Sequence, residues 1–156
     1  MPIAGQPAPE FELPDQQGKF HKLSDYQGKP LVIYFYPKDD TPGCTKEACA
    51  FRDATKEYER LGAQVLGVSP DSSASHQKFV DKYELPFPLL ADTERAMCEA
   101  YGVWQEKNMY GKKSMGVVRS TFVIAPDGKI RKIFARVKVE GHSDQVLLAL
   151  EGLEKS

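Results

Sequence analysis

The pattern of apolar and polar positions predicts an alternation of strands and helices. The run from Leu31 to Tyr36 is unbroken, apolar and rich in β-branched and aromatic residues, which is typical of a strand buried on both faces of a covered sheet. Residues 64–69 predict a second strand and residues 86–91 a short third one. Apolar residues at helical spacing predict one helix from Pro42 to Gly62 and another from Pro70 to Tyr83.

Further elements are predicted towards the two ends of the chain. Short apolar stretches on either side of residues 15–18 predict an N-terminal β-hairpin. Asp92 is expected to cap a short helix that reaches Tyr101. Residues 121–124 and 130–134 predict two strands joined by a tight turn, and Ser143 is expected to cap a last helix that has an apolar stripe.

The order of these elements predicts the fold class. Strands that alternate with helices favour an α/β architecture, and the late pair of strands adds an antiparallel edge to the sheet. This order resembles the thioredoxin fold, with a mixed central sheet flanked by helices and an N-terminal β-hairpin extension. Residues 102–116 show no clear period and are expected to form a long loop, which in a small domain is often functional.

Length and composition exclude several classes of protein. A chain of 156 residues fits one domain, here residues 1–156, at roughly 100–200 residues per domain. The net charge of −1 shows no basic excess that would indicate a nucleic-acid or anionic membrane partner. The longest apolar run is far shorter than the roughly 20 residues of a membrane span. No signal peptide precedes the first strand, so a cytoplasmic location is expected.

One segment carries candidate chemistry, because it joins the buried strand to a helix. Thr41 and Pro42 match the N-cap and first position of that helix, so Cys44 falls in its first turn. Unpaired backbone N–H groups and the positive end of the helix dipole gather there, and both stabilise a thiolate nucleophile. The alternative is that Cys44 is a small buried apolar residue without reactivity.

The other thiols and the imidazoles give weaker signals. Cys49 follows Cys44 by five positions, which is not the C-x-x-C spacing of a thioredoxin-type redox pair. No second pair of Cys or His residues stands at ligand spacing, so no metal site is predicted. His21, His76 and His142 are scattered and are interpreted as surface or capping residues. Cys98 lies among apolar neighbours and is interpreted as a core cysteine.

Pro37-x-x-x-Thr41-x-x-Cys44 matches the P-x-x-x-T-x-x-C motif of peroxiredoxins. With Cys49 at the fifth position after Cys44, the chain resembles the PrxQ, or bacterioferritin comigratory protein (BCP), subfamily of atypical 2-Cys type. The similarity extends through residues 101–107 and 118–124 and covers nearly the whole chain.

The resemblance implies a role for each matched residue. Cys44 would be the peroxidatic cysteine, which attacks the O–O bond of a hydroperoxide, and Cys49 would be the resolving cysteine. Thr41 would orient the peroxide, and Pro37 would shield the site from water. Arg119 would hold the thiolate and stabilise the charge that moves onto the leaving oxygen.

Glu47 stands where many peroxiredoxins carry a carboxylate that orients the arginine, but the subfamily varies there. The alternative is an exposed glutamate in the first turn of the helix, where it would favour the dipole.

The activity implied by the resemblance is a thioredoxin-dependent peroxidase that serves antioxidant defence and redox homeostasis. Hydrogen peroxide or an organic hydroperoxide would convert Cys44 to a sulfenic acid, and condensation with Cys49 would give an intramolecular disulfide. Thioredoxin would reduce that disulfide by exchange. No metal or other cofactor is expected, and the subfamily favours a monomer. Two alternatives are a thiol-based redox sensor with little turnover and a structural adaptor whose Cys44 is inert.

Overall fold

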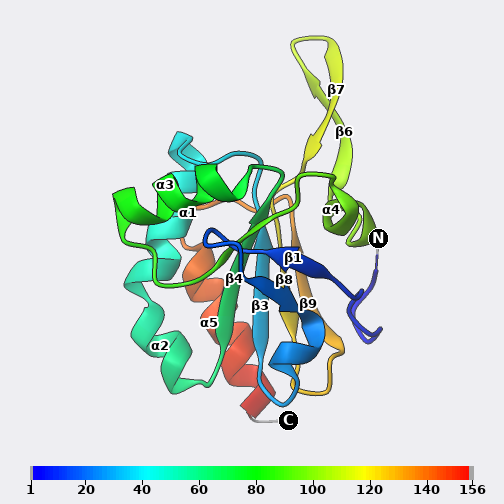
Figure 1. Cartoon of the computed structure of the whole chain (residues 1–156). Coiled ribbons are helices and arrows are strands. Elements are labelled where there is room, and N and C mark those ends of the chain that lie inside the picture. Colours follow the sequence, from blue (N-terminus) through cyan, green and yellow to red (C-terminus); the bar gives the residue numbers. More distant parts are fainter. Residues whose placement is uncertain (1, 155–156) are drawn as a thin grey trace.

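A five-stranded sheet forms the centre of the computed structural model, which describes residues 2–154 (Figure 1). The strand order is β5-β4-β3-β8-β9. The pairs β3–β4 and β4–β5 are parallel, whereas β3–β8 and β8–β9 are antiparallel. The α/β expectation with an antiparallel edge is therefore confirmed. The strands are β3 (Leu31–Phe35), β4 (Gln64–Ser69), β5 (Leu89–Ala91), β8 (Ser120–Ile124) and β9 (Ile130–Ala135).

Helices cover the sheet, and a small hairpin precedes it. The helices are α1 (Pro42–Asp53), α2 (Thr55–Arg60), α3 (Ser73–Tyr83), α4 (Ala96–Ala100) and α5 (His142–Glu154). The predicted N-terminal hairpin is confirmed as β1 (Glu12–Pro14) and β2 (Phe20–Lys22), followed by a 3₁₀ turn at Leu23–Tyr26. None of the helices among residues 2–154 has the length and apolarity needed to cross a membrane.

Strand β3 supplies both hydrophobic cores, because all five of its residues are buried and successive side chains point to opposite faces. Val32 and Tyr34 belong to the core that α1, α2, α3 and α5 cover. Ile33 and Phe35 belong to the other core, which includes residues of α4 and of the N-terminal segment. The unbroken apolar pattern of residues 31–36 is thus explained by burial on both faces.

Gly67 in β4 leaves room for the ring of Tyr34. A Cβ atom at Gly67 would lie 2.7 Å from Leu89 Cδ2 and 2.9 Å from Tyr34 Cζ, so any larger residue would displace its neighbours. The Tyr34 ring in turn stacks on Phe51 of α1, with 4.7 Å between the ring centroids. The rear half of α1 is therefore held against the sheet by an aromatic stack.

Three boundaries differ from the sequence prediction. The helix predicted from Pro42 to Gly62 is two helices, because Ala54 leaves helical geometry (φ −97°, ψ 9°). The last helix begins at His142, so Ser143 lies inside its first turn rather than capping it. Asp92 satisfies the start of α4 as expected, with its carboxylate accepting from the N–H groups of Met97 and Cys98, although Arg95 occupies the cap position itself.

The long loop predicted at residues 102–116 is wrong, because this segment forms a β-hairpin. Strands β6 (Trp104–Met109) and β7 (Lys112–Val117) pair over six residues each and stand away from the central sheet (Figure 1). Tyr110 and Gly111 both have positive φ values, as a two-residue hairpin turn requires. The hairpin was missed because β7 is exposed over most of its length, so no alternation of buried and exposed residues marks it.

Candidate active site

Cys44 is the third residue of α1, directly after the loop that leaves β3. The first backbone hydrogen bond of the helix runs from the N–H of Thr45 to the carbonyl of Thr41. The N–H groups of the first turn have no partner inside the helix, and the positive end of its dipole lies there. The Cys44 side chain is 1% exposed. The expectation that Cys44 falls in the first turn of the helix is confirmed, and its burial was expected only under the alternative of an unreactive residue.

Arg119 lies beside this thiol because of the strand register. Phe35 at the carboxyl end of β3 pairs with Ser120 at the start of β8, so the residue before Ser120 reaches the same end of the sheet. Its Nη2 donates to Cys44 Sγ over 3.2 Å. A Cβ atom at Gly43 would lie 3.2 Å from that Nη2, so glycine leaves the guanidinium its space. The structure therefore supplies a positive donor to the sulfur.

Glu47 is the second partner of the arginine. Arg119 Nη1 donates to Glu47 Oε1 over 2.6 Å, and the Glu47 side chain is buried. The alternative of an exposed glutamate is therefore wrong, and the contact agrees with a carboxylate that orients the arginine. Burial raises the pKa of Glu47 to about 7, and the charge of Arg119 opposes that shift. Although burial alone would lower it, the pKa of Arg119 is raised overall by Glu47 and Cys44, so this guanidinium stays charged.

Thr41 has the extended backbone of an N-cap, but its hydroxyl does not cap the helix. The Thr41 hydroxyl donates to the carbonyl of Lys38 over 2.8 Å instead, which closes the loop before α1. Its oxygen keeps lone pairs that can accept a hydrogen bond from a ligand. Pro37 lies half-buried two residues after the end of β3.

Cys49 lies in the same helix as Cys44, and both thiols are free. Five residues of regular α-helix separate the two Cα atoms by about 8.7 Å. A disulfide requires about 4.4–6.8 Å between Cα atoms. The structure is therefore a reduced form in which the two thiols cannot pair without a change in α1.

Cys98 is the third free thiol, and it lies in α4. Its side chain is buried in the core on the other face of the sheet. Burial raises the pKa of the Cys98 thiol far above the usual range, and the carboxylate of Asp92 adds to the shift. The interpretation of Cys98 as a core cysteine is confirmed.

The interpretation of the histidines as surface or capping residues is wrong, because all three are buried. His21 contacts Asp15 and Tyr26, and His142 contacts Thr121 and Gln145.

His76 is 0% exposed and contacts Asp39 and the carbonyl of Leu90. One signal for His76 was present in the sequence, since it lies three residues before the buried Phe79 on the same face of a predicted helix.

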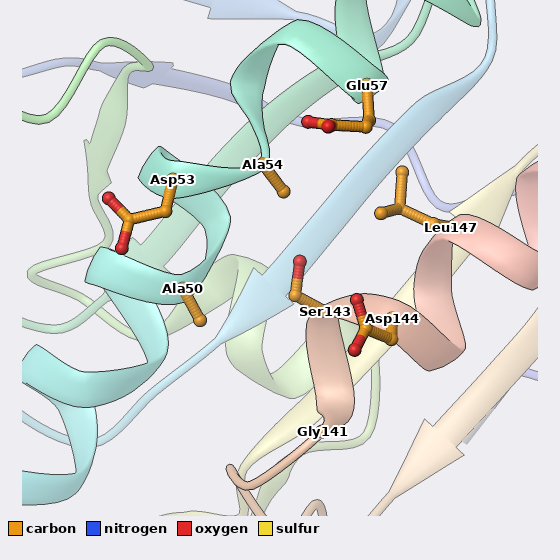
Figure 2. Close-up of a pocket in the computed structure, with 8 residues that line it drawn as sticks. All are labelled: Ala50, Asp53, Ala54, Glu57, Gly141, Ser143, Asp144 and Leu147. Atoms are coloured by element: carbon orange, nitrogen blue, oxygen red, sulfur yellow. The ribbon is translucent and has the colours of Figure 1, made fainter.

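Two cavities lie near these elements. One, of about 610 Å³, opens beside Arg119 and is also lined by Lys107 and Arg136. The other, of about 370 Å³, lies between α1, α2 and the start of α5. Figure 2 shows the second cavity, whose charged lining residues are the carboxylates Asp53, Glu57 and Asp144. Neither cavity is lined by a thiol, but the first is lined by Arg119, whose guanidinium contacts Cys44 Sγ.

Among residues 2–154, one group of side chains has the arrangement of a possible metal site. Asp39, Asp71 and His76 bring one candidate ligand atom each within 4.8 Å of the others. These atoms already take part in hydrogen bonds within the protein, including both ring nitrogens of His76. Internal hydrogen bonds, rather than a cation, account for this cluster.

The family model described as "AhpC/TSA family" matches residues 4–133. Among curated proteins, peroxiredoxin Bcp of Bacillus subtilis is 48% identical over 151 residues, covering 97% of this chain and 96% of the relative. Peroxiredoxin Bcp of Escherichia coli K12 is 45% identical over 144 residues, covering 92% of each chain. These matches span the strands and helices that build the site.

Solved structures of similar proteins share this fold. The bacterioferritin comigratory protein of Xanthomonas campestris, whose structures concern alkyl peroxide reduction, superposes with a TM-score of 0.90 and 43% identity, covering 96% of this chain and 98% of its own. This likeness confirms the thioredoxin-like peroxiredoxin fold.

Peroxiredoxin Q structures from the same organism include two separate cysteine-to-serine mutants. In that protein the two substituted cysteines stand 36 positions apart, a spacing that no two cysteines of this chain reproduce.

A buried thiol at a helix N-terminus, held by an arginine, is the arrangement on which thiol peroxidase chemistry depends. The family match and the full-length relatives agree with this geometry. The chain therefore belongs to the AhpC/TSA family and, within it, to the Bcp/PrxQ peroxiredoxins, which are thiol peroxidases.

Proposed function

We propose that this peroxiredoxin reduces hydrogen peroxide and alkyl hydroperoxides through Cys44, with Cys49 as the resolving cysteine and thioredoxin as the reductant. The single observation that carries the proposal is the contact of Arg119 Nη2 with Cys44 Sγ at the start of α1. Alkyl hydroperoxides are included because the Xanthomonas campestris relative is described as reducing alkyl peroxides.

In the first step the Cys44 thiolate attacks one oxygen of the O–O bond. A sulfur–oxygen bond forms, the O–O bond breaks, and the leaving oxygen takes up a proton to give water or an alcohol. Negative charge moves from sulfur towards the leaving oxygen. Arg119, whose Nη2 already faces the sulfur, stabilises that charge as it moves. Thr41 accepts from the peroxide, and Pro37 limits access of water.

In the second step the Cys49 thiol condenses with the Cys44 sulfenic acid, which releases water and forms an intramolecular disulfide. Cys49 fits this role better than Cys98 because it shares α1 with Cys44 and is half-buried, whereas Cys98 lies in the opposite core. A dithiol of thioredoxin then reduces the disulfide by exchange and becomes a disulfide itself.

The proposal also includes the cellular location, the oligomeric state and the cofactor requirement of the protein. The three free thiols and the peroxidase chemistry suit a reducing cytoplasm, where the enzyme would serve antioxidant defence as a monomer. Residues 1–156 form one functional domain in this proposal. The proposed reaction needs neither a metal nor an organic cofactor, because the cysteine sulfur atoms carry the electrons.

The test is a coupled assay with thioredoxin, thioredoxin reductase and NADPH on the natural chain and on Cys44→Ser, Cys49→Ser and Cys98→Ser. The proposal expects turnover only where both Cys44 and Cys49 are present, and a Cys44–Cys49 disulfide by mass spectrometry after peroxide treatment. A chain that is oxidised once but turns over slowly would instead favour the redox sensor. Turnover in Cys49→Ser and its loss in Cys98→Ser would move the resolving role to Cys98.

A further inference from the structure

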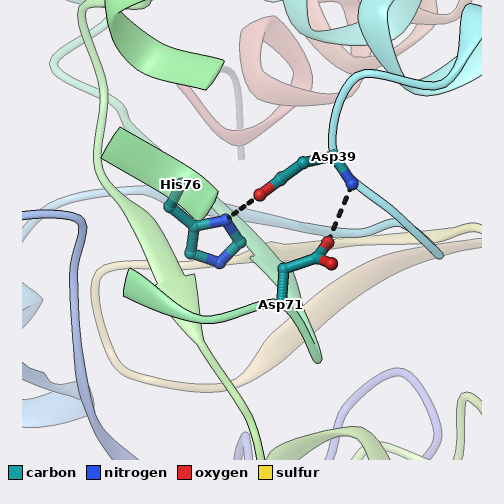
Figure 3. Close-up of side chains that lie close together, drawn as sticks. All are labelled: Asp39, Asp71 and His76. Carbon is teal, nitrogen blue, oxygen red and sulfur yellow. Dashed lines mark hydrogen bonds and ion pairs between the residues drawn. The ribbon is translucent and has the colours of Figure 1, made fainter. Parts of the chain in front are cut away.

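The side chain of Asp39 holds the loop between β3 and α1 in place, and Asp39 occupies one of the unspecified positions of the peroxiredoxin motif. Asp39 lies five residues before Cys44, and its carboxylate is almost fully buried. Tyr36 donates its hydroxyl to Asp39 Oδ1 over 2.6 Å, and Ser75 donates its hydroxyl to Oδ2 over 2.8 Å. His76 Nδ1 lies 2.7 Å from the same Oδ2 (Figure 3). The carboxylate thus ties the loop to α3.

The backbone of Asp39 is held as well. Its N–H donates to Asp71 Oδ2 over 2.8 Å (Figure 3). The hydroxyl of Ser69 donates to that same oxygen over 2.7 Å. Ser69 is the last residue of β4, and Asp71 lies two positions beyond it. Both the main chain and the side chain of Asp39 are therefore fixed to elements that lie outside α1.

The hydrogen bonds of His76 determine a proton count. His76 Nε2 faces the carbonyl oxygen of Leu90 at 2.9 Å, and a carbonyl can only accept, so Nε2 carries a hydrogen. His76 Nδ1 lies close to a carboxylate oxygen of Asp39. A hydrogen bond between these two atoms requires a hydrogen on one of them, because an unprotonated nitrogen and an ionised carboxylate can both only accept. The pair consequently holds one proton more than a neutral imidazole beside an ionised carboxylate. The other polar groups around the pair are the carboxylate of Asp71 and the hydroxyls of Tyr36 and Ser75.

A second set of contacts lies next to the first. Asp40 adopts a left-handed backbone (φ 56°), which is uncommon outside glycine and is held by its side chain. Its carboxylate accepts from Lys82 over 2.8 Å and from the hydroxyl of Tyr83 over 2.6 Å. On the far side of the two cysteines, Arg52 donates to the carbonyl of Tyr83 over 2.7 Å. Residues of α3 therefore form hydrogen bonds with the chain on both sides of residues 41–51.

We propose that Asp39 and His76 are a positioning pair, sharing an extra proton, that keeps the loop before α1 docked on α3 while the first turns of α1 rearrange. This inference rests on the proposed function, because it assigns a fixed end to the segment that must move to bring Cys49 to Cys44. The pair touches neither peroxide nor sulfur. It acts through the backbone of residues 39–41, which sets where Thr41 and Cys44 stand.

The experiment compares Asp39→Ala with Asp39→Asn in the full chain. Asp39→Ala removes all three side-chain contacts and should slow Cys44 oxidation about 10- to 100-fold, because a misplacement of about 1 Å can cost about 10²-fold in rate. Asp39→Asn offers an oxygen to Tyr36 and an N–H to a neutral His76, so it should recover most of the rate. In the natural chain, NMR should show a hydrogen on His76 Nε2 and a further hydrogen in the bond between Nδ1 and Asp39, whereas in Asp39→Asn Nε2 should be the ring nitrogen that carries a hydrogen.

A matched control exists in the N-terminal hairpin. Asp15 and His21 form another buried pair at 2.7 Å, away from the loop before α1. Asp15→Ala should lower stability without changing the rate of Cys44 oxidation by more than about twofold. If Asp39→Ala does not fold, Ser75→Ala removes one contact to Asp39 and should slow oxidation by a smaller factor, about two- to tenfold.

Two outcomes would overturn the proposal: Cys44 oxidation in folded Asp39→Ala within twofold of the natural chain, or an equal loss in Asp15→Ala. A readout without peroxide separates this failure from failure of the proposed function. Iodoacetamide alkylates Cys44 whether or not the protein turns over, and its rate should change in Asp39→Ala and return in Asp39→Asn. Normal alkylation kinetics in both variants, with a peroxidase-active natural chain, would reject the positioning role alone.

Discussion

Arg119 donates to the sulfur of Cys44 over 3.2 Å, although 75 positions of sequence separate the two residues. The pairing of β3 with β8 creates this contact, because it brings the residue before Ser120 to the end of the strand that leads to Cys44. The same guanidinium is fixed from the opposite side by Glu47, one turn after the cysteine. The charge near the thiol thus depends on the central sheet and not on the local motif.

Removing that charge should slow the first chemical step. Arg119→Ala is expected to reduce the rate of Cys44 oxidation by about 10²–10³-fold, as the loss of one preorganised donor typically does. Stopped-flow measurement of a single oxidation by hydrogen peroxide gives this rate. Arg136→Ala is the matched control, since Arg136 lines the same cavity, and it should stay within a few-fold of the natural chain. Near-normal oxidation in Arg119→Ala would contradict the role of the arginine.

Cys44→Ser should abolish hydroperoxide reduction. A serine hydroxyl in this place is neither ionised nor a soft nucleophile at neutral pH, so no sulfenic acid or disulfide can form. NADPH consumption coupled through thioredoxin measures the loss. Circular dichroism serves as the control for folding, because the substitution is nearly isosteric. Turnover above background in this variant would show that another residue attacks the peroxide.

Cys98→Ser should leave turnover nearly unchanged while lowering stability. The thiol is buried in the core that lies across the sheet from Cys44, and its raised pKa keeps it protonated. A buried serine hydroxyl without a partner costs about 1–3 kcal/mol. Urea unfolding measures the loss of stability and the coupled assay measures turnover. A Cys98→Ser variant that is stable but inactive would assign this thiol a place in the redox cycle.

Glu47 should make stability depend on pH. Burial raises its pKa to about 7 in the folded chain, above the ordinary 4.5, so between these values the folded state binds more protons than the unfolded state. The free energy of unfolding should therefore fall as pH rises from 4.5 to 7, by up to about 3 kcal/mol from this group. Glu47→Gln should lack this slope, and the difference between the two unfolding profiles isolates Glu47. Parallel profiles would show that its carboxyl titrates normally.

Helix α1 should unwind locally when Cys44 is oxidised. The two Cα atoms are about 8.7 Å apart on a regular helix, beyond the reach of a disulfide, so the first turns must open. Pro42 and Gly43 are poor residues for a helix interior, which favours opening at this end. Amide exchange of residues 42–50 should be faster in the peroxide-treated protein than in the reduced protein. Equal protection in both forms, with the Cys44–Cys49 disulfide confirmed, would contradict the unwinding.

Most of the sheet could be predicted from the sequence because burial leaves a readable pattern. Residues 31–36 and 64–69 are apolar on both faces, and the structure places them as adjacent parallel strands. The β6–β7 hairpin could not be predicted in this way, since β7 is exposed over most of its length and shows no alternation of buried and exposed residues. The break at Ala54 has no local signal either, because alanine favours helices.

In the candidate site, the motif predicted the positions of Cys44, Thr41 and Pro37. The burial and the partners of Glu47 and His76 could not be predicted from the sequence. Glutamate side chains are mostly exposed in proteins and histidine side chains are intermediate, yet both residues are buried here against partners distant in sequence. Arg119 lies 72 positions from Glu47, and Asp39 lies 37 positions from His76. Such pairings depend on the three-dimensional packing of α1 and α3, which single-sequence patterns do not contain.

The space left by Gly67 has a consequence for the cooperativity of α1. Because no side chain intrudes there, the ring of Tyr34 can lie flat under Phe51, and that stack secures the helix behind Cys49. The front of the helix has only a proline and a glycine before Cys44. Unwinding of α1 from its N-terminus is therefore opposed at Phe51 by the packing of this ring on Tyr34. A glycine in β4, outside the cysteine motif, is thus expected to limit how far α1 frays from its N-terminus.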